Sequence, residues 1–186
     1  MAELLTKKEQ RELLKVARDA VVAGVSTGKT PVIAPKSTGL QLESGCFVTI
    51  KQQGQLRGCI GSLEAHRPLG DDVRANAQSA AFRDPRFKPV SAEEFQRLKV
   101  EVSLLSKPVP MQFASETDAL SQLRPGIDGI ILVAGAARST FLPQVWEQIP
   151  EPRQFIAQLK LKAGLPANVW PEGIKLFRYE VQKWKE

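Results

Sequence analysis

Residues 46–61 read Cys-Phe-Val-Thr-Ile-Lys-Gln-Gln-Gly-Gln-Leu-Arg-Gly-Cys-Ile-Gly, and they contain the clearest structural signal in the chain. Two short runs, residues 46–50 and 56–60, are rich in the apolar and β-branched residues that favour strands. Gln53 and Gly54 lie between these runs, and a two-residue connection that contains glycine is a strong hairpin signal. The stretch therefore predicts an antiparallel hairpin.

The register of this hairpin fixes which side chains share a face. In the register set by a two-residue turn, Ile50 opposes Arg57 and Val48 opposes Cys59. Because side chains alternate across a strand, Arg57 and Cys59 are predicted to lie on the face that also carries Cys46, Val48 and Ile50. Cys46 and Cys59 are then diagonal neighbours about 7–8 Å apart, too far for a comfortable disulfide.

Arg57 and Cys59 form the first candidate site. A guanidinium two residues from a thiol on the same face is suited to stabilising a thiolate. Gly58 and Gly61 leave the backbone beside Cys59 without side chains, which favours close approach of a ligand or another chain. The alternative is structural: Cys59 is a small buried hydrophobic residue, and the glycines allow close packing.

Further helices and strands are predicted on both sides of the hairpin. Thr6 and Glu9 have the spacing of a capping box, and Asp71 and Asp72 complement the dipole of a second helix. Apolar periodicity predicts helices at residues 6–24, 68–81, 92–98, 116–123, 143–148 and 152–163. It predicts further strands at residues 99–105, 129–134, 139–142 and 174–184. This order favours one α+β domain over residues 1–186, with a mixed, mainly antiparallel sheet and flanking helices.

The composition is that of an ordinary folded protein. The chain has 186 residues, of which 42% are hydrophobic and 25% charged, and these values argue against global disorder. The net charge of +6 permits binding to nucleic acid, but the basic residues are scattered among acidic ones, so this support is weak. Two cysteines and one histidine are too few for a usual zinc site, and we expect no metal and no other cofactor.

Localisation is predicted from the start of the chain and from its apolar runs. The first residues mix acidic and basic side chains where a signal peptide would be apolar. No apolar run approaches the ~20 residues that cross a bilayer. We therefore expect a soluble, cytoplasmic protein with reduced cysteines and no membrane attachment.

The hexapeptide Leu56-Arg57-Gly58-Cys59-Ile60-Gly61 resembles the signature of the AMMECR domain family, which also occurs as protein A of the AmmeMemoRadiSam system. The resemblance continues in order through nearly the whole chain. It includes residues 80–87 (AAFRDPRF), 100–103 (VEVS), 126–129 (GIDG), 140–146 (TFLPQVW) and 162–164 (KAG). Each motif alone is weak, but the ordered set is specific.

The resemblance implies an α+β fold of two unequal subdomains, with a cleft between them near the hexapeptide. It also implies, by genetic association, a Memo-like protein and a radical S-adenosylmethionine (SAM) enzyme as partners. The chain lacks the cysteines of a typical radical SAM cluster, so a partner would perform any radical chemistry. The resemblance supplies no reaction; it marks Arg57, Gly58, Cys59, Ile60 and Gly61 as candidates for ligand binding.

Three further residues are candidates for the same site. His66 lies in the loop before the second predicted helix and is either a base for Cys59 or a solvated loop residue. Arg138 and Thr140 either line the cleft opposite the hexapeptide or are polar residues at a hairpin edge. Asp84 and Arg86 are interpreted as a tight turn held by their own salt bridge.

Three functions remain open at this point, and whether the protein is an enzyme is one of the questions. The first is an accessory module that binds a ligand or partner protein, because no recognisable catalytic set accompanies the hexapeptide. The second is a thiol-dependent enzyme that uses Cys59, with Arg57 stabilising the thiolate. The third is an RNA-binding module, which rests on the positive charge.

Overall fold

The computed structural model describes residues 4–27 and 37–186, and it divides into two compact units. The first unit consists of Met1–Leu105 together with Gln182–Glu186, and the second consists of Ser106–Val181. Helices accompany mainly antiparallel strands in both units, which confirms the predicted α+β class. Within the described residues the strands form two four-stranded sheets rather than one, and each unit is described separately below.

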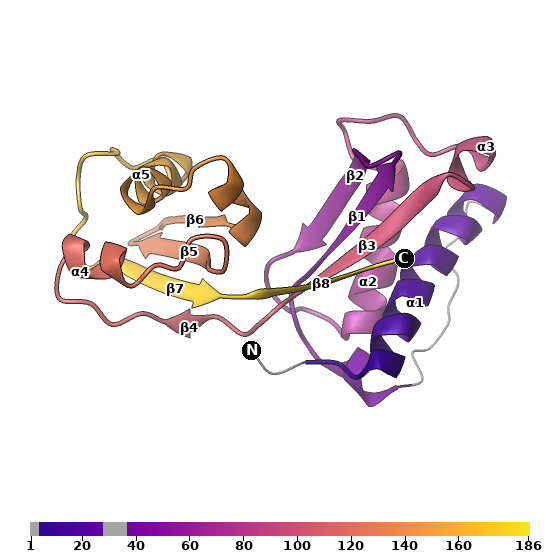
Figure 1. The fold of residues 1–186 in the computed structure, drawn as a ribbon, viewed down its shortest axis with the longest axis horizontal. Helices are drawn as coiled ribbons and strands as arrows, with labels where there is room; N and C mark the ends of the chain where they lie inside the picture. The colour runs from indigo at the N-terminus through magenta and orange to yellow at the C-terminus, as the bar shows by residue number, and fades with distance from the viewer. Residues whose placement is uncertain (1–3, 28–36) are drawn as a thin grey trace. The chain divides into compact units, whose positions relative to one another are not determined.

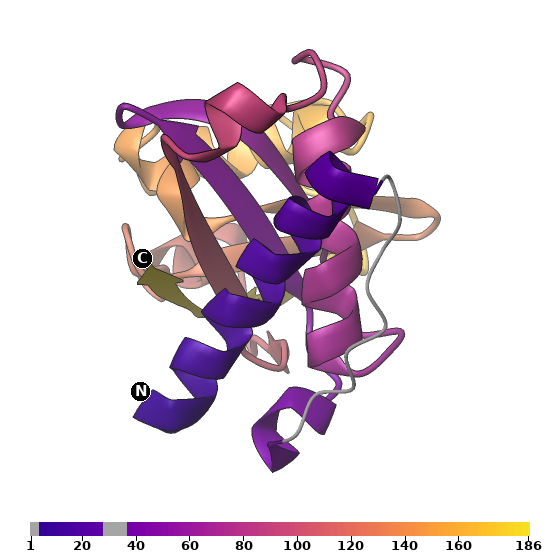
Figure 2. The ribbon, with the colours of Figure 1, turned by 90° about the vertical axis from the view of Figure 1, so that its right-hand side faces the viewer.

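The first unit has a sheet with the strand order β2-β1-β3-β8. Its elements are α1 (Lys7–Thr27), η1 (Thr38–Gln41), β1 (Cys46–Gln52), β2 (Gln55–Ser62), α2 (Leu69–Phe82), α3 (Ala92–Phe95), β3 (Leu98–Leu105) and β8 (Val181–Lys185). β1 is a central strand and pairs antiparallel with both β2 and β3. α1 and α2 both lie on one side of this sheet (Figures 1 and 2). One face of the sheet therefore packs against helices, and none of the helices in residues 4–27 and 37–105 covers the other face.

Helix α1 begins at the predicted capping box. The backbone N–H of Thr6 donates to the Glu9 carboxylate at 2.9 Å, and the backbone N–H of Glu9 donates to Thr6 Oγ1 at 3.3 Å. These two bonds satisfy N–H groups that the first helical turn leaves without partners. Leu13, Ala17 and Val21 then reach the core at helical spacing, as their periodicity predicted.

The hairpin of β1 and β2 forms as predicted, but beyond the turn its register differs from the predicted one. Gln53 and Gly54 have φ values of 51° and 82°, which a type I′ turn requires at both central positions. Lys51 pairs with Leu56 as expected, but the register then shifts and Ile50 pairs with Gly58. Arg57 is therefore the extra residue of a β-bulge, and the predicted pairing of Ile50 with Arg57 is wrong.

The bulge moves Cys59 to the opposite face from the predicted one. Cys59 pairs with Thr49 instead of Val48. Cys46, Val48 and Ile50 are fully buried in the core beneath the helices, so Thr49 and its partner Cys59 face the other way. We call this side of β1, β2 and β3 the open face, because none of the described helices of its unit covers it. A one-residue shift exchanges the two faces of a strand, which explains why one bulge changes the neighbours of Cys59.

The second unit has a sheet with the strand order β4-β7-β5-β6. Its elements are β4 (Val109–Pro110), α4 (Glu116–Ser121), β5 (Gly129–Ala134), β6 (Ala137–Phe141), η2 (Pro143–Glu147), α5 (Pro152–Lys162) and β7 (Lys175–Tyr179). α5 lies over one face of this sheet (Figure 1), and its Phe155 and Leu159 are fully buried in the core of this unit. No helix in the described part of the chain is long and apolar enough to cross a membrane.

The single strand predicted at residues 174–184 is instead two strands in two sheets. β7 belongs to the sheet of the second unit, β8 belongs to that of the first, and Glu180 separates them. The backbone N–H of Glu180 donates to Ser106 Oγ at 2.9 Å, and its carbonyl accepts from the N–H of Ser106 at 2.9 Å. The Glu180 carboxylate also binds Arg124 at 2.7 Å. Side-chain alternation continues across Glu180, so the sequence pattern alone does not reveal the break.

Candidate functional site

Cys59 lies in the edge strand β2, and both of its backbone polar groups are bound. Its N–H donates to Asp84 Oδ2 at 2.9 Å, and its carbonyl accepts from Arg86 Nη2 at 3.2 Å. Asp84 and Arg86 follow the C-terminal end of α2, so a loop supplies the partners that a further strand would otherwise give. The backbone at Cys59 is thereby fixed from outside the sheet.

Asp84 and Arg86 also bind each other, as the sequence analysis predicted. Arg86 Nε and Nη2 donate to the two carboxylate oxygens of Asp84 at 2.9 and 2.7 Å, and the Arg86 backbone N–H donates at 3.1 Å. Hydrogen bonds from Arg86 hold the pKa of the Asp84 carboxyl well below its usual range, and Asp84 in turn raises the pKa of Arg86. The sequence did not reveal that this pair also binds Cys59, because the two segments are far apart in the chain.

Arg57 is paired with a carboxylate rather than with the thiol. Its Nε and Nη2 donate to the two oxygens of Glu94 at 2.5 and 3.0 Å, a bidentate arrangement that lowers the pKa of Glu94. The third nitrogen, Nη1, is buried without a hydrogen-bond partner. The predicted position of Arg57 beside the thiol depended on a register that the bulge changes. The guanidinium that contacts Cys59 is that of Arg86.

The two glycines of the hexapeptide are required by close packing. A Cβ atom at Gly58 would lie 2.1 Å from the backbone oxygen of Ala80, so this glycine lets α2 approach β2. A Cβ atom at Gly61 would lie 2.3 Å from the ring of Phe47. Of the two interpretations left open by the sequence, the structural one therefore describes Gly58 and Gly61.

A row of polar side chains crosses the open face at the level of Cys59. Thr49 pairs with Cys59 in β2 and with Glu101 in β3, and Thr49 Oγ1 donates to Cys59 Sγ at 3.4 Å. Glu101 is 8% exposed, and its carboxylate forms an ion pair with Lys51 Nζ at 2.9 Å. We call Cys59, Thr49 and Glu101 the thiol row. Sequence reasoning missed Thr49 and Glu101. The alternation of Val100, Val102 and Leu104 is the signal that could have placed Glu101 on the opposite face of its strand.

Cys46 has a different environment on the helix-covered face. Its thiol donates to Asp72 Oδ2 at 3.2 Å, and Asp72 also accepts from Asn76 at 3.1 Å and binds Arg67 at 3.0 Å. Burial, and then the nearby Asp72 carboxylate, raise the pKa of Cys46 far above its usual value. Cys46 is therefore held as a thiol. Both cysteines are free, as predicted, although the reason is that they lie on opposite faces.

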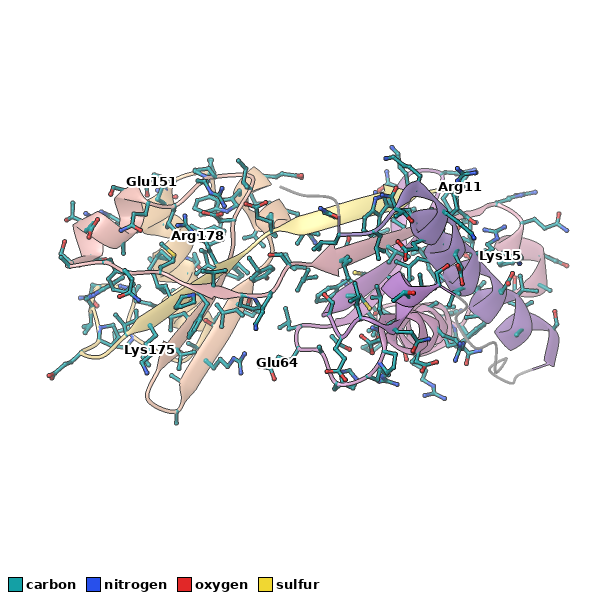
Figure 3. The ribbon with its side chains drawn as sticks, turned by 90° about the horizontal axis from the view of Figure 1, so that it is seen from below. Arg11, Lys15, Glu64, Glu151, Lys175 and Arg178 are labelled. Atoms are coloured by element: carbon teal, nitrogen blue, oxygen red, sulfur yellow. The ribbon has the colours of Figure 1, made fainter. Side chains whose placement is uncertain are left out.

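His66 lies beside the Asp72 group rather than beside Cys59. Its Nε2 is 2.9 Å from Arg67 Nε and 3.4 Å from Asp72 Oδ1, and its Nδ1 is 3.1 Å from the carbonyl oxygen of Glu64. The residue is exposed in the loop after β2. Glu64, in the same loop, is labelled in Figure 3. No group of three potential metal-binding side chains occurs in the part of the chain that the structure describes.

The remaining candidate residues, Ile60, Arg138 and Thr140, do not take part in the contacts around Cys59 described above. Ile60 is partly buried against the core of the first unit. Arg138 and Thr140 lie in β6 of the second unit; Arg138 is exposed, and Thr140 Oγ1 is 3.0 Å from the hydroxyl of Tyr179. Burial raises the pKa of that hydroxyl to about 12. The expectation that Arg138 and Thr140 line a cleft opposite the hexapeptide concerns the relation between the two units and stays a prediction.

Comparison with known proteins gives a consistent result over the whole chain. The profile of a family described as AMMECR1 matches residues 14–184. A protein of Methanothermobacter thermautotrophicus is 38% identical over 98% of this chain and 96% of its own. A protein of Methanocaldococcus jannaschii is 37% identical over 98% of this chain and 92% of its own. The crystal structure of an uncharacterized protein from Pyrococcus horikoshii is similar with a TM-score of 0.85 and 32% identity, covering 99% of this chain and 94% of that one.

Proposed function

This chain belongs to the AMMECR1 family, and from that premise we propose that it is an accessory module that binds a ligand or a partner protein. The proposed binding surface is the open face around Cys59. The partners that we propose are a Memo-like protein and a radical SAM enzyme, in keeping with the family resemblance of the sequence. The proposed location is the cytoplasm.

One observation carries the choice of surface: both backbone groups of Cys59 are fixed from outside by Asp84 and Arg86. Three separate segments therefore contribute to one small region, namely β1, β2 and the loop after α2. Two of these segments contain the family motifs LRGCIG and RDPRF. A rigid backbone that presents polar side chains on a face without helices is a suitable platform for recognition.

The proposal is tested by binding of the purified chain to the Memo-like protein and the radical SAM enzyme encoded in the same genome. Thr49→Gln adds bulk at the centre of the open face, and we expect it to weaken binding at least about tenfold, as steric obstruction of an interface does. The control is Lys15→Gln on the exposed side of α1 (Figure 3), which should bind like the unchanged protein. Thermal unfolding verifies that both variants are folded.

Binding that is equally strong with Thr49→Gln would place the interface elsewhere on the molecule. No measurable binding to either protein, and no small molecule retained by the purified chain, would contradict the proposal as a whole. Isothermal titration calorimetry measures binding to each protein, and mass spectrometry of the denatured preparation detects a retained small molecule.

A second candidate function, a thiol-dependent enzyme, is favoured by the surroundings of Cys59. Cys59 is half-buried, and its Sγ accepts a hydrogen bond from Thr49. The Arg86 guanidinium contacts the carbonyl of the same residue. In this candidate function the guanidinium that stabilises the Cys59 thiolate is that of Arg86, whereas sequence reasoning assigned this role to Arg57.

A further inference from the structure

Two lysines on the open face lie directly opposite each other. Lys51 is two residues after Thr49 in β1 and therefore points to the same side of the sheet. It pairs with Lys99 of β3, and opposite residues have Cβ atoms about 4.5–5.5 Å apart. Like charges in this position destabilise a sheet, so the pair needs an explanation other than the stability of the chain.

Strand β8 adds two more lysines to the same face. β8 lies beside β3, and its Trp184 packs against the core of the first unit. Because side chains alternate along a strand, the residues on either side of Trp184 point to the open face. These residues, Lys183 and Lys185, are both exposed. We call the four side chains on the three strands the lysine patch: Lys51, Lys99, Lys183 and Lys185.

Acidic residues compensate only part of this charge. Among the described residues that point to the open face from β1, β2, β3 and β8, Glu101 is the only acidic one. It is 8% exposed and pairs with Lys51 at 2.9 Å. Lys99, Lys183 and Lys185 form no ion pair with any other residue that the structure describes. Four lysines against one carboxylate leave three positive charges without a counter-charge on this face.

Protection of a sheet edge accounts for only part of the lysine patch. β8 is an edge strand, and lysines on edge strands discourage pairing with another chain. This reason applies to Lys183 and Lys185. It does not apply to Lys51 and Lys99, because β1 and β3 are both central strands. An anionic occupant accounts for all four lysines, since negative charge on the open face relieves the repulsion between them.

We propose that the lysine patch binds an acidic, extended segment of a partner protein. The inference rests on the proposed function, and it adds the chemistry of the partner that the open face recognises. An extended segment places alternate side chains about 6.6–6.8 Å apart, which is also the spacing of Lys183 and Lys185 along β8. Carboxylates at alternate positions of such a segment therefore meet successive lysines of the patch.

The composition of the open face favours a protein segment over a nucleic acid. Single-stranded nucleic acids bind sheet faces by stacking their bases on exposed aromatic side chains. Phe47 is the only aromatic residue among the described residues of the first sheet that point to the open face, and it is half-buried. Its ring is so close to Gly61 that a Cβ atom there would lie 2.3 Å away. The compact ammonium groups of lysines, in contrast, need only carboxylates as partners.

The test titrates the full chain with a fluorescein-labelled peptide of four Glu-Thr repeats and follows the fluorescence anisotropy at low salt. Lys99→Gln/Lys185→Gln removes two charges from the patch, and we expect about fivefold weaker binding, as for the loss of two exposed ion pairs. The matched control is Lys107→Gln/Lys175→Gln, which removes the same charge from exposed lysines of the second unit (Lys175 is labelled in Figure 3) and should bind like the unchanged protein. Binding should weaken with added salt, and a peptide of four Gln-Thr repeats should not bind.

Equal losses in the two double variants would overturn the inference, because the attraction would then follow the net charge of the chain and not the lysine patch. An oligouridylate with the same number of negative charges should bind more weakly than the peptide. Tighter binding of this RNA, with the same dependence on the patch, would overturn the choice of a protein segment. Partner binding without peptide binding would contradict this inference alone, whereas peptide binding without partner binding would contradict only the proposed partners.

Stability supplies a second measurement that separates the lysine patch from lysines that support the fold. Lys99→Gln removes the repulsion from Lys51, so we expect the midpoint of thermal unfolding at low salt to rise by about 1–2 °C. The rise should disappear in about 1 M salt, where charges are screened within about 3 Å. A lower midpoint in Lys99→Gln would show that Lys99 stabilises the fold, and it would overturn the inference from repulsion.

Discussion

The two faces of the first sheet each carry one cysteine, and the two thiols differ in burial and in hydrogen bonding. Cys46, on the helix-covered face, is fully buried, and Asp72 accepts its thiol hydrogen. Cys59, on the open face, is half-buried and accepts a hydrogen bond from Thr49. Both belong to one hairpin of mainly apolar residues. The bulge at Arg57, and not the residue type, therefore decides that Cys59 lies on the open face while Cys46 lies in the core. A structural thiol and a candidate functional thiol differ here by one extra residue in the strand.

The largest expected effect belongs to the helix-covered face. Gly58→Ala would bring a Cβ atom to 2.1 Å from the Ala80 backbone oxygen, and α2 would have to move. We expect a loss of about 3 kcal/mol in the free energy of unfolding, the upper range for overpacking a core. Urea unfolding measures it, with Gln55→Ala, exposed in the same strand, as a control that should change little. A loss as small as that of the control would show that α2 does not pack on β2 as described.

The buried Asp72 is the next test of the same face. Asp72→Ala removes the acceptor shared by Cys46, Asn76 and Arg67, and buried donors without partners are costly. We expect a loss of about 2 kcal/mol in unfolding free energy. Asp71→Ala is the matched control, because this neighbouring carboxylate is 43% exposed and pairs only with Arg74 among the contacts described. Equal losses in the two variants would contradict a special role for the buried carboxylate.

The pH dependence of stability sharpens the role of Asp84 at the edge of β2. The pKa of Asp84 is lowered in the folded state, so its contribution is complete above its unfolded value of about 3.9 and is lost as pH falls toward the lower folded value. Asp84→Asn should be less stable than the unchanged protein by about 1.5 kcal/mol at pH 7. Thermal unfolding between pH 7 and about 2 should show the difference shrinking with acid. A difference that stays constant would mean that the charge of Asp84 does not contribute.

The smallest expected effect concerns Arg57, which the sequence suggested as the partner of the thiol. A double-mutant cycle of Arg57→Ala and Glu94→Ala should give a coupling of about 1 kcal/mol, because the pair is bidentate and largely buried. The exposed pair of Lys15 and Asp19 on α1 is the reference and should couple by less than about 0.5 kcal/mol. If Arg57→Ala instead slows the reaction of Cys59 while Arg86→Ala does not, the assignment of the cation must be reversed.

Sequence reasoning was most successful where the signal is local. The capping box of Thr6 and Glu9, the turn at Gln53 and Gly54, and the boundaries of β5 depend on residues close in the chain, and the structure confirms them. The α+β class follows from the order of such elements. The bulge was missed because it follows a correctly predicted turn and nothing in the local pattern marks an extra residue.

The failures share a long-range cause. The break at Glu180 depends on Ser106 and Arg124, and the fixation of Cys59 depends on Asp84 and Arg86. Such contacts join residues separated by tens of positions, and a single sequence carries no signal for the pairing. Glu101 is an intermediate case: the alternation of apolar residues in β3 could have placed it on the face opposite Val100 and Val102, but its place in the thiol row needed the register of β1.

The most direct measurement is the alkylation of both cysteines by iodoacetamide in the native protein, read peptide by peptide by mass spectrometry. If the open face is the functional surface, Cys59 is alkylated in the folded protein, and Cys46 reacts only after denaturant unfolds the chain. Protection of Cys59 to the same degree as Cys46 would contradict this, since no ligand, partner or substrate could then reach the thiol row.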